Sequence, residues 1–139
     1  MVDKAANDDG LDIFAEFDVQ DDGVWVPYKN DVEFLIARAN NPKYRRRLSY
    51  FYEKNKRLLD GKGDAAEAKS NEIMATVMGE TILLGWKGKV SIKGEVLAYN
   101  KANAIRLLEV PLFREWVTSQ ANDQHAYKTV KDEEDAENL

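Results

Sequence analysis

The residues that could do chemistry are few, and their spacing suits no common catalytic arrangement. The chain has one histidine, His125, and no cysteine. A general base needs an orienting partner, and the adjacent Asp123 and Gln124 would not face His125 on a helix. One histidine without cysteine does not predict a zinc site. His125 is therefore interpreted as a surface residue.

Other candidate motifs also favour structural roles. Asp18, Asp21 and Asp22 precede Gly23, but they do not supply ligands at the spacing of a calcium-binding loop. The segment Gly61-Lys62-Gly63 lacks the flanking strand and the further glycines of a phosphate-binding loop, so it predicts a helix–helix connection. The serines have no nucleophile-elbow context. The sequence therefore predicts no enzyme activity, no cofactor and no metal.

Length and composition set the broad class. A chain of 139 residues suits one domain with a modest core. The absence of cysteine fits a reducing cytosol. No apolar run reaches the roughly 18 residues that span a bilayer. Residues 1–10 lack the apolar region of a signal peptide. We therefore expect a cytosolic protein with no membrane partner.

The net charge of −5 conceals an asymmetry along the chain. Residues 1–33 hold ten acids and two lysines, a net charge of −8, whereas residues 38–57 hold eight bases and Glu53, a net charge of +7. Residues 128–139 are acidic again. A basic middle between acidic ends with a pI near 5.0 does not favour nucleic acid as a partner.

The basic middle contains Arg45-Arg46-Arg47, which on a helix would point in three directions. This pattern favours a solvated face, which could pair with the acidic N-terminal segment. Nearby tyrosines also suit a protein-binding surface, because such interfaces are rich in arginine and aromatic residues. The candidate basic interaction face comprises Arg38, Arg45, Arg46, Lys54 and Arg57.

The first third of the chain predicts a hairpin and a helix. Residues 1–12 are polar and rich in aspartate, so we expect them to be disordered. Residues 13–19 and 24–28 have β character and flank an Asp-Asp-Gly turn signal, which favours a short N-terminal β-hairpin. Pro27 cannot donate to a ladder, so its strand should lie at an edge or stop there. Asn30 is predicted to cap a helix with the apolar face Val32, Leu35, Ile36 and Ala39.

Four further helices are predicted. Asn41 and Pro42 should open one that runs to about residue 60, and Asp64 should cap one that runs to Leu84, with Gly85 and Trp86 closing its end. Residues 87–99 form either a tiny hairpin joined by Gly94 or an ordered loop. Asn100 caps a short helix with Ala104, Leu107 and Leu108 inward. Pro111 begins the last predicted helix, whose apolar face comprises Leu112, Phe113, Trp116, Val117 and Ala121.

These elements predict a mainly α fold of about five helices. They form one small bundle-like domain over residues 13–127, with the short N-terminal β-hairpin at its start. Both acidic termini are expected to be disordered, and residues 128–139 are interpreted as a flexible tail.

A run in the last third of the chain carries a resemblance. It comprises Leu83-Leu84-Gly85-Trp86-Lys87-Gly88, Gly94-Glu95, Ala98-Tyr99-Asn100 and Ala104-Ile105-Arg106-Leu107-Leu108. Upstream lie Val32-Glu33-Phe34, Arg38-Ala39-Asn40-Asn41-Pro42 and Tyr44, and downstream lies Leu112-Phe113-Arg114-Glu115-Trp116-Val117. In this order, over roughly residues 32–127, the chain resembles the tail assembly chaperones of long-tailed bacteriophages.

The resemblance implies a protein that works by contact. Such chaperones act in the host bacterial cytoplasm during phage assembly and are absent from the mature virion. They bind the tape measure protein, keep it soluble and help recruit the tail tube protein. Many are also made as a longer frameshifted form, a further partner, and an oligomer is compatible with the sequence. The alternative is a structural virion protein, such as a head–tail adaptor or a minor tail component.

A chaperone of this kind needs apolar grooves between helices to receive a helical segment. Methionine is suited to such a groove because its side chain adapts to varied surfaces. The candidate contacts are Met74, Met78, Leu84, Trp86, Leu107, Leu108 and Trp116. For each of these residues taken singly, the sequence favours a place in the ordinary core over a client contact.

Overall fold

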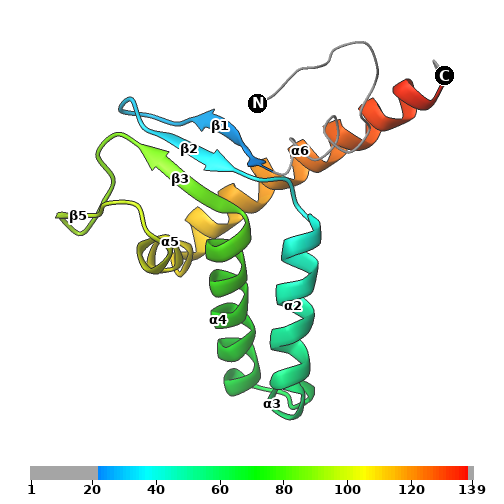
Figure 1. Cartoon of the computed structure of the whole chain (residues 1–139). Helices are drawn as coiled ribbons and strands as arrows, with labels where there is room; N and C mark the ends of the chain where they lie inside the picture. The colour runs from blue at the N-terminus through cyan, green and yellow to red at the C-terminus, as the bar shows by residue number, and fades with distance from the viewer. Residues whose placement is uncertain (1–21, 138–139) are drawn as a thin grey trace, which may run out of the picture.

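The computed structural model describes the backbone of residues 22–137 and the side chains of residues 22–125. Its elements (Figure 1) are β1 Val24–Pro27, β2 Glu33–Ile36, α2 Pro42–Lys54, α3 Lys56–Asp60, α4 Asp64–Thr81, β3 Leu83–Lys87, β4 Ser91–Ile92, β5 Glu95–Val96, α5 Lys101–Leu108 and α6 Pro111–Glu137. Helices dominate this small domain, so the predicted mainly α class is confirmed.

Strands β1, β2 and β3 form an antiparallel sheet with β2 in the centre. Among residues 22–137, β1 pairs with β2 alone, which agrees with the edge position predicted from Pro27. The predicted hairpin partner, residues 13–19, lies outside the described residues, as do residues 1–12. The helix predicted to start at Asn30 is wrong. Asn30 and Asp31, with φ of 60° and 63°, instead turn the chain between β1 and β2.

β2 is a strand because its alternate side chains pack into one core. Phe34 and Ile36 are buried on the inner face of the sheet, and Val32 continues the alternation at the preceding turn. On its other side β2 pairs with β3, and Phe34 lies opposite Trp86. The prediction that α4 continues to Leu84 and is capped by Gly85 is therefore wrong, since α4 ends at Thr81 and Gly85 lies inside β3.

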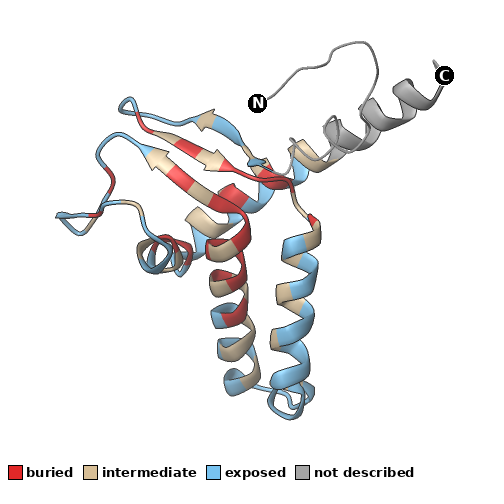
Figure 2. Cartoon of the chain, in the orientation of Figure 1, coloured by how far each residue is buried: buried red, intermediate tan, exposed pale blue. Residues whose placement is uncertain are grey.

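α2 and α4 run side by side away from the sheet, with α3 at the far end (Figure 1). The cap predicted at Asn41 is confirmed, because its side-chain oxygen accepts from the amide of Tyr44 at 2.9 Å. The single helix predicted to residue 60 is broken at Asn55, whose amide donates to the Phe51 carbonyl at 2.8 Å. Burial is concentrated in the sheet and in the adjoining half of α4, whereas α2 contains no buried residue (Figure 2).

The residues that follow β3 form a hairpin, one of the two alternatives that the sequence allowed for residues 87–99. Ser91–Ile92 pairs with Glu95–Val96, and the turn places Lys93 and Gly94 at φ of 48° and 85°. Two positive φ angles are typical of the type I′ turn that suits a two-residue hairpin loop. Asn100 then caps α5 as predicted, by accepting from the amide of Asn103 at 2.8 Å.

α6 packs its first turns beneath the sheet. The Phe34 ring lies 5.2 Å from Phe113 and 5.7 Å from Trp116, between centroids, and Val117 is buried. Leu112 does not join this face, because it is 78% exposed. The backbone is helical to Glu137, where a flexible tail from residue 128 was predicted. None of the described helices is long and apolar enough to cross a membrane.

Candidate functional site

Two adjoining hollows separate α6 from the hairpin of α2 and α4. The larger, of about 420 Å³, is lined by Met74, Met78, Arg114, Glu115, Thr118, Ser119, Asn122 and Asp123. The smaller, of about 190 Å³, is lined by Ala39, Asn40, Tyr44, Met74, Met78, Ile82, Thr118, Ala121 and Asn122. Four residues belong to both hollows, so they form one continuous surface, the methionine groove.

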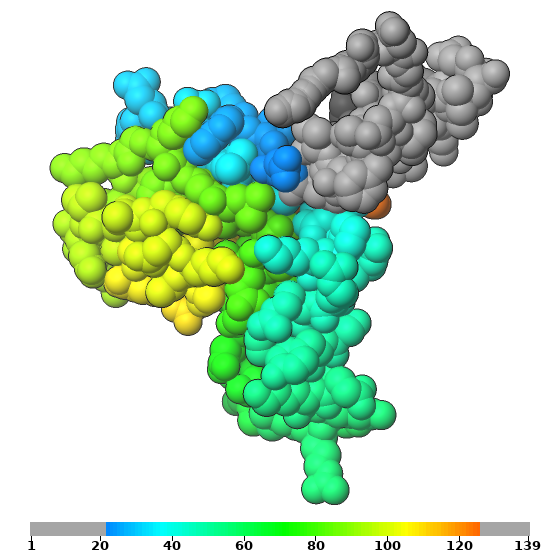
Figure 3. Space-filling model, viewed as in Figure 1, coloured from blue at the N-terminus to red at the C-terminus, as the bar shows by residue number. Residues whose placement is uncertain are grey.

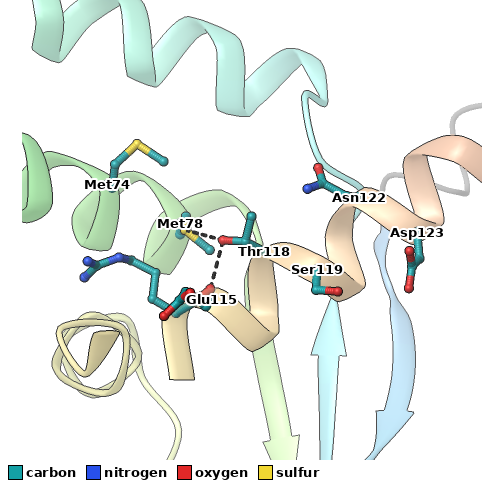
Figure 4. A pocket seen from close by; sticks show the side chains of 8 residues that line it. Met74, Met78, Glu115, Thr118, Ser119, Asn122 and Asp123 are labelled. Atoms are coloured by element: carbon teal, nitrogen blue, oxygen red, sulfur yellow. Dashed lines mark hydrogen bonds between the residues drawn. The ribbon is translucent and has the colours of Figure 1, made fainter. Parts of the chain in front are cut away.

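The groove takes its shape from helical spacing. Met74 and Met78 are four residues apart on α4, and Thr118 and Asn122 are four apart on α6, so each pair shares a face. Figure 4 shows these side chains from the two helices around one opening. The Thr118 hydroxyl donates to the Arg114 carbonyl at 2.8 Å and lies 3.8 Å from the Met78 sulfur. Met78 is only 3% exposed and forms the floor, whereas Met74 is half-buried on the wall.

Polar groups surround this apolar floor. Arg114 donates to the Leu108 carbonyl at 2.9 Å and to the Asn71 side chain at 3.4 Å, which ties α6 to α5 and α4. On the side of α2, burial raises the pKa of the Tyr44 phenol above its ordinary value, and Tyr52 adds to the rise. The phenol is therefore neutral near pH 7. An apolar floor with a few polar groups around it is typical of a site that binds by shape and contact.

His125 does not lie alone on the surface, as the sequence suggested. It is half-buried, and its Nδ1 is 3.4 Å from a guanidinium nitrogen of Arg38. Arg38 is itself only 9% exposed, so it does not belong to the exposed basic face to which the sequence assigned it. Within the described part of the chain, no group of three or more His, Cys, Asp or Glu side chains could hold a metal ion.

The groove gathers only part of the set of candidate contacts. Met74 and Met78 line it, as does Tyr44, which was not among the candidate contacts. Asn122 also lines it, but a single sequence gives no signal that α4 would lie opposite this exposed asparagine.

The other five candidates lie elsewhere. Leu107 and Leu108 are buried in the core. Trp86 and Trp116 both pack against the Phe34 ring, at 6.3 Å and 5.7 Å between centroids. Leu84 lines a separate hollow at the start of α2. These five residues therefore do not contribute to the methionine groove.

The side chains of Arg45, Arg46 and Arg47 point in different directions, as helix geometry predicts. Arg45 donates to the Asn40 carbonyl at 2.8 Å, Arg46 lines the hollow at the start of α2, and Arg47 pairs with Glu80 at 3.0 Å. Arg45, Arg46, Lys54 and Arg57 are exposed on α2 and α3, whereas Arg38, the fifth residue proposed for the basic face, is buried.

Comparison with known proteins gives one family. Residues 39–138 match a family model described as "YdaY prophage protein". No curated protein and no solved structure shows significant similarity to the chain. The match spans more than two thirds of the chain and takes in every helix that lines the groove, whereas β1 and β2 precede it.

Proposed function

We propose that this chain, which belongs to the YdaY prophage protein family, is a phage tail assembly chaperone. In this proposal the methionine groove holds a helical segment of the tape measure protein and keeps that protein soluble. The chaperone also helps to recruit the tail tube protein. It acts in the host cytoplasm during assembly and leaves before the virion is complete. Binding alone accounts for these steps, so the proposal requires no catalytic residue.

One observation carries the proposal: an open apolar groove between helices, with two methionines side by side in it. An amphipathic helix presents apolar side chains at spacings of three and four residues, and such a row fits a groove between two helices. The unbranched side chain of Met74 can change rotamer to suit different client surfaces. The buried Met78 and Ile82 beneath it keep the floor in place.

The rim suits reversible binding. Glu115 and Asp123 are exposed on α6 beside the groove, and Arg114 crosses its end. A polar rim around an apolar centre limits the size of the exposed apolar patch, so the free protein stays soluble while the groove remains open to a client.

The test is co-expression with the tape measure protein of the same prophage, with the soluble fraction of that client as the measurement. Met74→Glu places a charge on the groove wall, and Asn122→Trp fills the groove from α6. Both variants should lose most of the solubilising effect of the wild type. Val96→Trp is the matched control, because Val96 is exposed on the β4–β5 hairpin and lines no part of the groove.

Circular dichroism and a thermal melt of each variant show whether it is folded. A client that stays insoluble with the wild type rejects the chaperone function. Groove variants that are folded and fully active reject the assignment of the groove. The competing proposal, a structural virion protein, predicts that mass spectrometry finds this chain in purified particles, which the chaperone proposal does not.

A further inference from the structure

The outer surface of α2 and α3 is strongly basic. Six exposed cationic side chains lie on it within one short stretch of chain: Lys43, Arg45, Arg46, Lys54, Lys56 and Arg57. We call these six residues the basic surface. Tyr50 is half-exposed among them. In the space-filling view, the hairpin of α2 and α4, with α3 at its end, projects from the body of the molecule, so its outer side faces solvent (Figure 3).

The carboxylates of residues 22–125 do not neutralise the charges of the basic surface. Arg47 pairs with Glu80, but among residues 22–125 none of the six residues of the basic surface forms an ion pair. Glu53 is the acid that shares their exposed side of α2. Lys43 and Arg46 are three residues apart on α2, where like charges repel each other, so an acidic occupant would stabilise this surface.

The acidic N-terminal segment begins at the end of this surface. A hollow of about 470 Å³ at the start of α2 is lined by Asp22, Asn41, Pro42, Lys43, Arg46, Thr81 and Leu84. Asp22 is the first described residue, so residues 1–21 join the described structure beside Lys43 and Arg46. The point at which residues 1–21 are attached, Asp22, therefore lies beside the N-terminal end of the basic surface.

We infer that residues 1–21 bind the basic surface of the same chain. The segment carries seven acidic residues and one lysine, a net charge of −6. Its extended length reaches about 70 Å, whereas the helical stretch from Lys43 to Arg57 is about 22 Å long. A tether this short gives an effective concentration on the order of millimolar, so weak ion pairs suffice. The bound segment shields the basic surface from nucleic acid and from other acidic partners.

This inference does not depend on the proposed function, because the basic surface and the methionine groove share no residue. The absence of native cysteine allows a clean test in the full chain. A nitroxide on Gly10→Cys should broaden backbone amides nearby. At about 20 mM salt, amide peaks from Lys43 to Lys54 should fall below about half of their intensity, and they should recover at about 0.5 M salt, where charges are screened.

Matched charge variants make the test specific. Replacing Asp8, Asp9, Asp12 and Asp18 by Asn should abolish the broadening. Neutralising Asp132, Glu133, Glu134 and Asp135 removes the same number of charges at the other end and should leave the broadening unchanged. Broadening that is absent at low salt, that spreads evenly over the molecule, or that survives loss of the N-terminal acids overturns the inference.

Two other occupants would give different signals. If spin-labelled chain broadens the amides of unlabelled chain in a mixture, the basic surface binds a second copy. If a short DNA duplex shifts the amides of α2 equally in the wild type and in the variant with neutral N-terminal residues, the surface is open to nucleic acid. Either result overturns the inference.

Discussion

At the scale of single residues, two asparagines cap helices in different surroundings. Asn41 is buried, and its amide also donates to the carbonyls of Arg38 at 2.9 Å and Thr81 at 3.3 Å. Asn100 is exposed and caps α5 at a similar distance. The side chain of Asn41 thus joins the segment that follows β2, the start of α2 and the end of α4, whereas Asn100 acts locally.

Asn41→Ala should therefore cost more than Asn100→Ala. The first loses a cap and leaves buried carbonyls without a donor, so we expect a loss of about 2–4 kcal/mol in the free energy of unfolding. The second loses only an exposed cap, so we expect about 1 kcal/mol. Asn41→Asp keeps the cap acceptor and should fall between them. Urea unfolding measures all three, and equal costs at both sites would contradict this account.

At the scale of elements, the sequence predicts two helix caps correctly, whereas the caps predicted at Asn30, Asp64 and Gly85 are wrong. Asn41, Pro42 and Asn100 act through contacts within four residues, so local pattern is enough to place them. β2 and β3 exist because residues about fifty apart pair with each other. The segment from Val32 to Ala39 satisfies both a helical period and a strand alternation, and only its partner decides between them.

The same limit applies to the methionine groove. Local pattern assigns Met74 and Met78 to one face of a helix, which is correct. It cannot tell which apolar residues β3 and α5 will enclose, so Trp86, Leu107 and Leu108 look as available as the methionines. The division between groove and core is set by tertiary packing, which a single sequence does not contain.

The close approach of α4 and α5 depends on Gly79. A Cβ added there would lie 2.5 Å from Cγ1 of Ile105 and 3.2 Å from its backbone nitrogen. In an open helix Gly→Ala stabilises by about 1 kcal/mol, but overpacking costs about 1–3 kcal/mol, so Gly79→Ala should be net destabilising by up to about 2 kcal/mol.

A double-mutant cycle tests the cause. Ile105→Ala removes the clashing carbon, so adding Gly79→Ala to that variant should cost less than it does in the wild type. Urea unfolding of the wild type, the two single variants and the double variant gives the coupling free energy between the two positions. If the cost of Gly79→Ala is unchanged, the contact with Ile105 is not its origin.

The β4–β5 hairpin is linked to α5 by an exposed ion pair. Arg106 donates to Glu95 at 3.1 Å, and this hydrogen bond, with the nearby charge, lowers the pKa of the Glu95 carboxyl. Because the folded pKa is lowered, the pair stabilises the fold above the pKa of the unfolded chain. That contribution is lost as the pH falls through the folded value.

An NMR titration of the Glu95 carboxyl carbon measures this effect. Arg106→Gln should raise the midpoint towards the ordinary value, and added salt should do so in part. Arg114→Gln is the matched control, because Arg114 contacts a carbonyl and an amide oxygen rather than Glu95. A midpoint that does not move in Arg106→Gln would show that another group lowers it.

At the scale of the whole molecule, burial divides the chain into a packed body and a projecting hairpin. Ile36, Val77, Ile82 and Leu83 are fully buried where α4 meets the sheet, whereas α2 and α3 bury no residue completely (Figure 2). Few buried apolar contacts permit local opening at low free energy. The basic surface therefore lies on the part of the fold that opens most easily.

Hydrogen exchange should reveal this division. Amides of α3 and of the second half of α2 should exchange at least roughly 100-fold faster than those of Val77, Ile82 and Leu83, which corresponds to about 3 kcal/mol of difference in opening free energy. A client bound in the methionine groove contacts α4 and α6, so it should slow exchange there first. Equal exchange in α2 and in the second half of α4 would instead mean that the hairpin and the body unfold as one unit. In that case binding at the groove would stabilise the basic surface as well.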